Sequence, residues 1–399
     1  MKLILKLIAG IVGGILIGLF APEWINRILL TFQGLFSEFL TFIIPLLIFF
    51  FVASGIANLP KKSAHLLGRT LGMSYGSTII AGLLAYFITA AIVPSLEVVR
   101  NTVGDVGGHG VLPFLVMEIP PLLSVMGALA AAFVFGLGIT SQSAKTLHQA
   151  TDEGRNIIEM VLNKVIIPLL PFYIAGVFAD LALSGTVFET LQTFGIILVL
   201  ALIMHWLWLT IMFVVTGIAT GRSPWLLLKN MLPAYFTALG TMSSAATIPV
   251  TLQAAKSNGV SKRIADFTIP LCATIHLSGS IITITSCAVA VMVIQEGLTV
   301  PSFLEVLPFI LMLGVVMLAA PGVPGGAVMS ALGLLTSMLG FGEAAIALMI
   351  ALYMAQDSLG TACNVTGDGA IALWVDKFAK DEGVPQTDDL PTPKENHSA

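Results

Sequence analysis

Residues 320–326 have the sequence Ala-Pro-Gly-Val-Pro-Gly-Gly and interrupt an apolar segment that runs from 304 to 342. A second apolar segment, 232–256, is interrupted in a similar way by small and hydroxyl residues at 240–244 and by a proline on either side. Backbone that leaves the helix at membrane depth must be buried in protein or line a wet cavity. We therefore interpret both segments as helical hairpins that enter a membrane and return on the same side.

The whole chain has the composition of a membrane protein. Of its 399 residues, 57% are hydrophobic and only 10% are charged, and the mean hydropathy is +0.98. Soluble proteins carry about 25% charged residues, so a water-soluble enzyme, a nucleic-acid binder and a disordered protein are excluded. The net charge of −4 gives no sign of a nucleic-acid partner. The three cysteines lie in apolar segments, so no disulfide framework is expected.

Eight further apolar segments are long enough to cross a hydrocarbon core of about 30 Å, which takes about 20 residues per helix. They lie near residues 4–21, 35–57, 70–94, 112–138, 157–183, 191–219, 265–293 and 346–375. With the N-terminus inside and both hairpins returning, only Arg27 and Arg100 of the 18 lysines and arginines fall outside. This distribution obeys the positive-inside rule. We expect an all-α polytopic protein with eight transmembrane helices, two re-entrant hairpins and both termini in the cytoplasm.

The last expected span carries four polar residues on one helical face. Asp357, Thr361, Asn364 and Asp368 are spaced at i, i+4, i+7 and i+11. A carboxylate at mid-membrane costs about 2.5–3.5 kcal/mol, which favours a functional role. Because hard cations take oxygen ligands, we interpret the face as a partner for a substrate amine together with a cation ligand. The alternative is a polar seam between helices.

Three other stretches are candidate parts of the same site. The tip at 241–249 offers backbone N–H groups and a helix start that suit a carboxylate, although small residues there also suit a helix contact. The tip at 320–326 is either a hinged lid or an ordinary loop. Gly279 and its polar neighbours indicate a locally unwound segment in the seventh span. His276 in that segment either carries protons or is a buried neutral histidine. His205 is interpreted as an interface or packing residue.

In this order, these elements resemble the dicarboxylate/amino acid:cation symporter family, the glutamate transporter homologues. The resemblance covers nearly the whole chain and is most specific at Gly-Val-Pro-Gly, 322–325, and Asn-Val-Thr-Gly-Asp, 364–368. It implies an elevator-type homotrimer with inverted repeats, in a cell (inner) membrane. Residues 1–60 (helices 1–2) and 112–185 (helices 4–5) would form the scaffold. Residues 61–111 (helix 3 and an outside loop) and 186–379 would form the transport domain. The polar, proline-containing residues 380–399 are expected to be a disordered cytoplasmic tail.

The resemblance also implies a role for individual residues. Asp357 would hold the amino group of the substrate and Ser244 would meet its carboxylate. The implied substrate-binding set is Ser243, Ser244, Thr247, Val323, Gly325, Asp357, Gly360, Thr361 and Asn364. The implied Na⁺ ligands, mostly backbone carbonyls, are Cys272, His276, Asn364 and Asp368 at a first site and Thr274, Met317, Leu318 and Ala320 at a second. No cofactor is expected besides the coupling ion, Na⁺ or H⁺.

Two departures from the family pattern bear on the substrate and on the coupling. Acidic-substrate members place an arginine where this chain has Gly360, and no lysine or arginine follows before Lys377. A buried substrate carboxylate without a partner costs several kcal/mol, which favours a small neutral amino acid. The pattern around Asp357 is similar to the serine/threonine-transporting branch, although that branch lacks this glycine. Ser278 replaces the aspartate of a third sodium site, so two or fewer Na⁺ ions per cycle are expected.

Several alternatives stay open at the level of sequence. One is a carboxylate or dicarboxylate symporter in which His276 or a loop residue replaces the missing arginine. Another is a proton-coupled carrier that uses His276 with Asp357. A channel is disfavoured because re-entrant hairpins around paired carboxylates favour occlusion. An intramembrane enzyme is disfavoured because no G-x-S-x-G or H-E-x-x-H spacing occurs.

Overall fold

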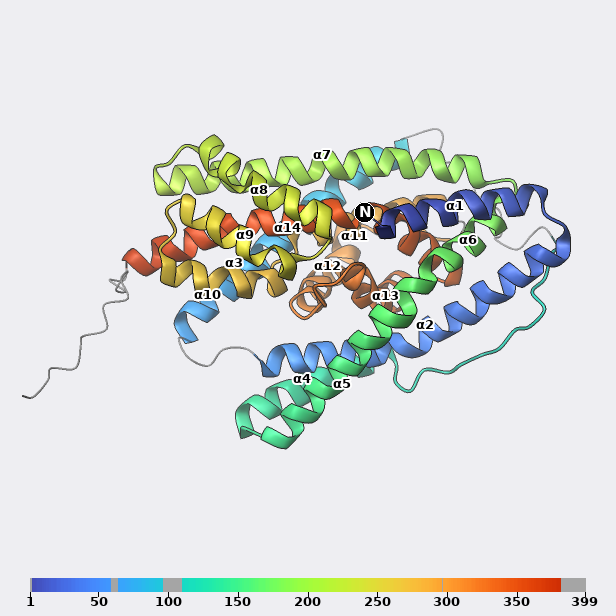
Figure 1. The fold of residues 1–399 in the computed structure, drawn as a ribbon, viewed down its shortest axis with the longest axis horizontal. Helices are drawn as coiled ribbons and strands as arrows, with labels where there is room; N and C mark the ends of the chain where they lie inside the picture. The colour runs from blue at the N-terminus through green and yellow to red at the C-terminus, as the bar shows by residue number, and fades with distance from the viewer. Residues whose placement is uncertain (1, 59–63, 96–109, 296, 382–399) are drawn as a thin grey trace, which may run out of the picture.

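The computed structural model of the chain describes residues 2–58, 64–95, 110–295 and 297–381. Regular structure in these residues is entirely helical (Figure 1). Most of the loop expected before residue 111, and the tail expected at 380–399 beyond its first two residues, lie outside the described residues. The helices in chain order are α1 (Lys2–Phe20), α2 (Glu23–Ala57), α3 (Ala64–Ile92), η1 (Val93–Ser95), α4 (Val125–Gln142), α5 (Lys145–Val161), η3 (Leu162–Ile166), α6 (Ile167–Leu183), α7 (Val187–Thr220), α8 (Pro224–Thr241), α9 (Ser244–Ser257), α10 (Lys262–Ile275), α11 (Ser278–Ile294), α12 (Phe303–Met317), α13 (Gly326–Leu339) and α14 (Glu343–Asp381).

Seven helices in the described residues are long and apolar enough to cross a membrane. They include two composite spans, α5–η3–α6 over Lys145–Leu183 and α10–α11 over Lys262–Ile294. The apolar part of α1, Leu5–Phe20, is shorter than these seven, as are α12 and α13. The expectation of an all-helical, multi-pass membrane protein is therefore confirmed, whereas the count of eight spans stays a prediction.

The segment before α4 differs from the expected helix at 112–138. Helix begins only at Val125, and the residues before it run alongside α2 without regular structure (Figure 1). Arg27 and Glu38 of α2 hold this segment, through a 3.0 Å hydrogen bond to the Leu112 carbonyl and a 2.8 Å bond from the Ile119 N–H. The adjacent prolines at 120–121 lack an N–H and disfavour a helix there.

The start of α4 follows from its cap. The side chain of Ser124 accepts a 3.1 Å hydrogen bond from the Gly127 N–H, which satisfies a donor of the first turn.

The second expected helix, at 35–57, starts earlier than predicted, because α2 already begins at Glu23 directly after Pro22. A proline before the first helical residue is compatible with a helix start because no N–H partner is needed there.

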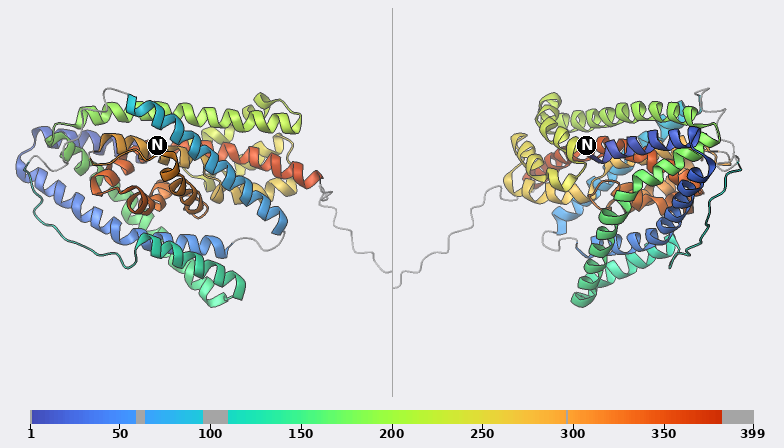
Figure 2. Two further views of the ribbon diagram at one scale, coloured as in Figure 1. Left: turned by 180° about the vertical axis from the view of Figure 1, so that it is seen from behind. Right: turned by 45° about the vertical axis from the view of Figure 1, so that its right-hand side comes forward.

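The helices pack in two groups. One contains α1, α2, α4, α5 and α6, and the other contains α3 and α7 to α11 around α14, with α12 packed on α3 and α13 (Figure 2). The groups touch where α13 lies on α2 and α4. The expected division into scaffold and transport domains, and a relative motion between them, stay predictions.

Three helix interruptions predicted from the sequence are confirmed. The chain leaves the helix between α8 and α9, between α10 and α11, and between α12 and α13. Because α8 packs on α9 and α12 packs on α13, the outer two interruptions are the tips of helical hairpins. The middle interruption lies within the composite span, where His276 and Leu277 have extended and irregular backbone angles.

In the sequence, Gly367 and Gly369 predict a loosening of the last span beside Asp368, and this prediction is wrong. α14 is one continuous helix through both positions. The two glycines instead allow close packing, since an added Cβ would lie 2.8 Å from a ring carbon of His276 at one and 2.6 Å from the sulfur of Met231 at the other. Tertiary contact overrides the local preference of glycine to leave a helix.

Candidate functional site

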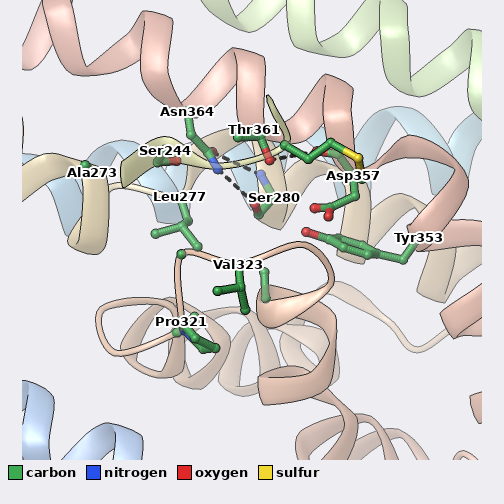
Figure 3. A pocket seen from close by; sticks show the side chains of 14 residues that line it. Ser244, Ala273, Leu277, Ser280, Pro321, Val323, Tyr353, Asp357, Thr361 and Asn364 are labelled. Carbon is green, nitrogen blue, oxygen red and sulfur yellow. Dashed lines mark hydrogen bonds between the residues drawn. The ribbon is translucent and has the colours of Figure 1, made fainter. Parts of the chain in front are cut away.

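The three helix interruptions meet α14 at one pocket (Figure 3). It encloses about 330 Å³ of space not filled by atoms. The pocket is bordered by the first hairpin tip, the α10–α11 break, the second hairpin tip and one face of α14. In chain order the lining residues are Met242, Ser244, Ala273, Leu277, Ser280, Ala320, Pro321, Gly322, Val323, Ala327, Tyr353, Asp357, Thr361 and Asn364.

Asp357 supplies the formal charge of this pocket. It is the only lining residue, among those the structure describes, that is charged at neutral pH. Its side chain is buried, and its Oδ2 accepts a 2.8 Å hydrogen bond from the Gly325 N–H of the second tip. The buried Tyr353, one turn earlier on α14, points its hydroxyl toward the same carboxylate (Figure 3). A negative charge in a low-dielectric pocket is suited to a cationic ligand group.

Asn364 ties α14 to the α10–α11 break. Its Oδ1 accepts hydrogen bonds from the N–H groups of Gly279 (2.7 Å) and Ser280 (3.2 Å), and its Nδ2 donates to Ser280 Oγ (2.9 Å). The amide thereby caps the first turn of α11, where N–H groups lack helical partners. Thr361 also lines the pocket, and its hydroxyl donates to the Asp357 carbonyl one turn before it (2.9 Å).

The two hairpin tips contact each other above the pocket. Ser243 Oγ donates a 3.2 Å hydrogen bond to the Gly322 carbonyl and accepts one from the Ala246 N–H (3.3 Å). Thr247 is fully buried and donates to the Ser243 carbonyl (2.8 Å). Ser243 and Thr247 thus shape the tip, whereas Ser244, the first residue of α9, borders the pocket itself.

Gly360 lies outside the lining of the pocket. A Cβ added there would meet Thr283 Oγ1 at 3.2 Å and the Gly279 carbonyl oxygen at 3.4 Å. Conversely, a Cβ added to Gly279 would overlap the Gly360 carbonyl and lie close to the Cys363 side chain. The two glycines therefore form the close crossing of α11 with α14, and a long side chain at 360 would be directed into α11.

The residues of the first expected ion site form a hydrogen-bonded chain between three helices. His276 Nδ1 lies 2.9 Å from Asp368 Oδ1, and His276 Nε2 lies 2.9 Å from Ser77 Oγ on α3. Both ring and carboxylate are buried. The backbone N–H of His276 also donates a hydrogen bond to the Cys272 carbonyl (2.9 Å). The His276 ring is therefore hydrogen-bonded to Asp368, and it lies outside the lining of the pocket that contains Asp357.

The residues of the second expected ion site lie at the end of α12 and beside the break. Thr274 Oγ1 donates to the Leu271 carbonyl (2.8 Å), and Met317 is the last residue of α12, directly before Leu318. Ala320 borders the pocket, as does Ala273 of α10. No group of three or more histidine, cysteine, aspartate or glutamate side chains forms a metal cluster in the described part of the chain. A hard cation here would need carbonyl oxygens.

Sequence reasoning did not single out Tyr353 or Ser77, and it gave His205 only an interface or packing role. Tyr353 precedes Asp357 by four residues, so the helical period could have placed it on the same face. Ser77 carries no local signal, because its contact with His276 joins residues far apart in the sequence. His205 is fully buried and its Nε2 lies 3.0 Å from the Gly279 carbonyl and 3.1 Å from Thr283 Oγ1, so it supports the break from α7.

Comparison with known proteins identifies the family. The model of the sodium:dicarboxylate symporter family matches residues 3–378. The chain is 29% identical to the serine/threonine transporter SstT of Acinetobacter baumannii (strain AYE), over 94% of this chain and 96% of that one. It is 27% identical to the excitatory amino acid transporter 1 of Homo sapiens over 65% of this chain, and spans about half (48%) of that protein's length. All of these names denote transporters, not enzymes. The chain belongs to the sodium:dicarboxylate symporter family.

Proposed function

We propose that the protein is a secondary active symporter that couples Na⁺ influx to uptake of a small neutral amino acid of the serine, threonine or alanine kind. The observation that carries this proposal is the single charge of the pocket, the Asp357 carboxylate. An α-amino group would pair with Asp357. The α-carboxylate would lie at the start of α9 beside Ser244, where helix N–H groups favour an anion. A small side chain would then face Val323 and Thr361.

The same pocket disfavours a substrate with a second carboxylate. Among the described lining residues there is no lysine, arginine or histidine to receive it. A buried, unpaired carboxylate costs several kcal/mol, or more than a hundredfold in affinity. The two positions that could have supplied a cation also fail to reach the pocket, because Gly360 faces α11 and His276 is bonded to Asp368. The name of the SstT relative supports the neutral-substrate proposal.

For coupling, we propose that Na⁺ binds at Asp368 and the neighbouring backbone carbonyls, and at a second site beside Thr274 and the end of α12. Two or fewer ions per cycle are expected. One charge moved through 100 mV is worth about 2.3 kcal/mol, and a tenfold Na⁺ gradient adds about 1.4 kcal/mol. Relative to a three-sodium symporter, the limiting accumulation ratio is therefore lower by about 500-fold. Reversal potentials that require three Na⁺ ions per substrate would contradict this stoichiometry.

The finer architecture is part of the same proposal. We place eight transmembrane helices and two re-entrant hairpins in a cell (inner) membrane, with both termini in the cytoplasm and three protomers per assembly. The packing of α3 and α7 to α11 around α14 as one group supports an elevator-like movement past the group of α1, α2 and α4 to α6, which it touches through α13 and where α14 and α7 meet α1 and α6.

The deciding experiment is uptake of labelled L-serine by proteoliposomes under an inward Na⁺ gradient. Unlabelled alanine, aspartate and succinate serve as competitors, and liposomes without protein or with equal Na⁺ on both sides serve as controls. Na⁺-dependent uptake that only alanine inhibits is expected. Inhibition by aspartate or succinate would assign the protein to the acidic-substrate class, and uptake driven by a proton gradient without Na⁺ would assign it to proton coupling.

A further inference from the structure

An apolar groove lies on the outer side of α3, α7 and α14, away from the substrate pocket. About 990 Å³ of space not filled by atoms lies in and directly outside the groove. The groove is lined almost entirely by apolar side chains, including Trp208, Ile211 and Val215 of α7 and Trp374 and Phe378 of α14. The three helices pack against one another, and Figure 2 shows α3 crossing the other two. Ile211 and Val215 are 37% and 49% exposed, so the groove opens to the outside of the protein.

The length of the groove fits one leaflet of a bilayer. Along α7 it extends from Trp208 to Thr216, which at about 1.5 Å per residue is about 12 Å. Half of a hydrocarbon core is about 15 Å deep. The groove therefore has room for part of an acyl chain that enters from one side of the membrane.

Cations lie at one end of the groove. The guanidinium of Arg69, near the start of α3, lies 5.3 Å from the centroid of the Phe378 ring. The ammonium of Lys377 lies 5.9 Å from the centroid of the Trp374 ring and donates a 2.7 Å hydrogen bond to the Ala219 carbonyl. Both rings belong to the wall of the groove. Arg222, Lys380 and Asp376 border a neighbouring hollow that Lys377 also lines. Lys380 pairs with Asp376 (2.6 Å), so Lys377 and Arg222 supply the net positive charge at this end.

We propose that this groove binds an anionic phospholipid from the bilayer. One acyl chain would lie between α3, α7 and α14, and the phosphate would lie at Lys377 and Arg69. Basic pockets between transmembrane helices recognise acidic headgroups through this combination of charge and apolar surface. The groove also includes Ser77, whose hydroxyl is bonded to His276. A bound chain would therefore lie one hydrogen bond away from the His276–Asp368 pair.

Two glycines of α3 provide a matched pair of variants. Gly76 lines the groove, and a Cβ added there has no atom within 4 Å, so Gly76→Leu would start a side chain in open space and occupy part of the groove. Gly72 lies one turn earlier, has the same open space at its Cβ and does not line the groove. For the headgroup, Lys377→Gln removes a charge at the groove, and Lys229→Gln removes an exposed charge elsewhere.

Quenching of tryptophan fluorescence by brominated lipid measures the binding, because Trp208 and Trp374 lie in the groove wall. The full chain in an uncharged detergent is titrated with dibrominated phosphatidylglycerol or dibrominated phosphatidylcholine. We expect tighter, saturable quenching by phosphatidylglycerol. Gly76→Leu should abolish this component and Gly72→Leu should keep it. Lys377→Gln should raise the half-saturating concentration about fivefold, the equivalent of one charge near a membrane surface, and Lys229→Gln should leave it unchanged.

Four outcomes would overturn the proposal. Equal quenching by the two lipids would mean that the groove has no preference for an anionic headgroup. Quenching that persists in Gly76→Leu would place the lipid elsewhere. Displacement of the lipid by inorganic phosphate at equal concentration would mean a site for a free anion. Binding only in a chain shortened after Asp381 would mean that the acidic residues beyond it occupy the basic end.

Discussion

The two hairpin tips differ in length and in what holds them. The first tip is short, because only Met242 and Ser243 separate α8 from α9. It is held mainly by its own residues: the Met242 N–H bonds to the Ala238 carbonyl, and the Ser243 side chain caps α9. The second tip extends from Leu318 to Gly325 and contains two prolines and two glycines. A third glycine, Gly326, follows it directly as the first residue of α13. It has an internal hydrogen bond from the Gly326 N–H to the Val323 carbonyl (2.9 Å), and it is also hydrogen-bonded to Asp357 of α14 and to Ser243 of the first tip.

This difference assigns different tasks to the tips. A turn held by its own hydrogen bonds keeps its shape when the pocket changes occupancy. A longer tip that is fixed by a hydrogen bond to the substrate-binding carboxylate changes its position when that carboxylate takes another partner. We therefore expect the second tip to be the lid of the pocket and the first tip to be its fixed wall. Lid motions of this kind commonly use short irregular segments with small residues.

The largest effect is expected from Asp357→Asn. The amide oxygen can still accept the hydrogen bond from the Gly325 N–H, so the second tip keeps its contact while the partner of the substrate amine is lost. Removal of one member of a buried ion pair costs about 3–5 kcal/mol, so L-serine uptake should fall at least a hundredfold. Initial rates of uptake in proteoliposomes measure this change.

The control for this variant is Asp266→Asn, which removes an exposed carboxylate that pairs with Lys256 outside the pocket. It should leave uptake within about twofold of the wild type, because exposed ion pairs contribute about 0–1 kcal/mol. Uptake by Asp357→Asn within tenfold of the wild type would contradict the assignment of Asp357 to the amino group.

An intermediate effect is expected from Gly325→Ala. Gly325 has φ +75°, where an L side chain costs about 1–2 kcal/mol. Its added Cβ would also lie 2.8 Å from the sulfur of Met354. Because Gly325 supplies the N–H that bonds to Asp357, closure of the lid should become less favourable. We expect KM for serine to rise about tenfold, the equivalent of about 1.4 kcal/mol.

Gly322→Ala in the same tip is the matched control. A Cβ added at Gly322 has no atom within 4 Å, and its φ lies outside the left-handed region. KM should therefore change less than twofold. Equal effects of the two substitutions would mean that general stiffening of the tip, and not the conformation at Gly325, sets closure.

The sequence was sufficient for the features that have local signals. Proline and glycine inside apolar segments located all three helix interruptions, and the helical period placed Asp357, Thr361 and Asn364 at one pocket. The start of α4 was predicted too early, because the prediction followed the apolar residues from 112 onward and ignored the two prolines at 120–121. Those prolines remove backbone donors whatever the apolarity of their neighbours.

Features that depend on packing could not be predicted from the sequence. Gly360 follows Asp357 by three residues, which is compatible with the pocket face, yet α11 crosses α14 at this position. Which side of a helix a neighbour covers is not a local property. For the same reason the side-chain bond from His276 to Asp368, across 92 residues, had no local signal, although the family resemblance had implied that both residues serve one ion site. The expected roles of the site residues in binding substrate and Na⁺ stay predictions.

The smallest effect is expected from Ser243→Ala, which changes the fixed tip. The variant loses the cap of α9, worth about 1 kcal/mol, and the 3.2 Å bond to the Gly322 carbonyl, which touches the lid from outside the pocket. We expect KM to rise about threefold, with the thermal unfolding midpoint lowered by a few degrees, since a net neutral hydrogen bond is worth about 0.5–1.5 kcal/mol. Ser243→Thr keeps the hydroxyl and should restore both values. Should Ser243→Ala raise KM more than Gly325→Ala does, closure would be set by the first tip, and the assignment of wall and lid would have to be reversed.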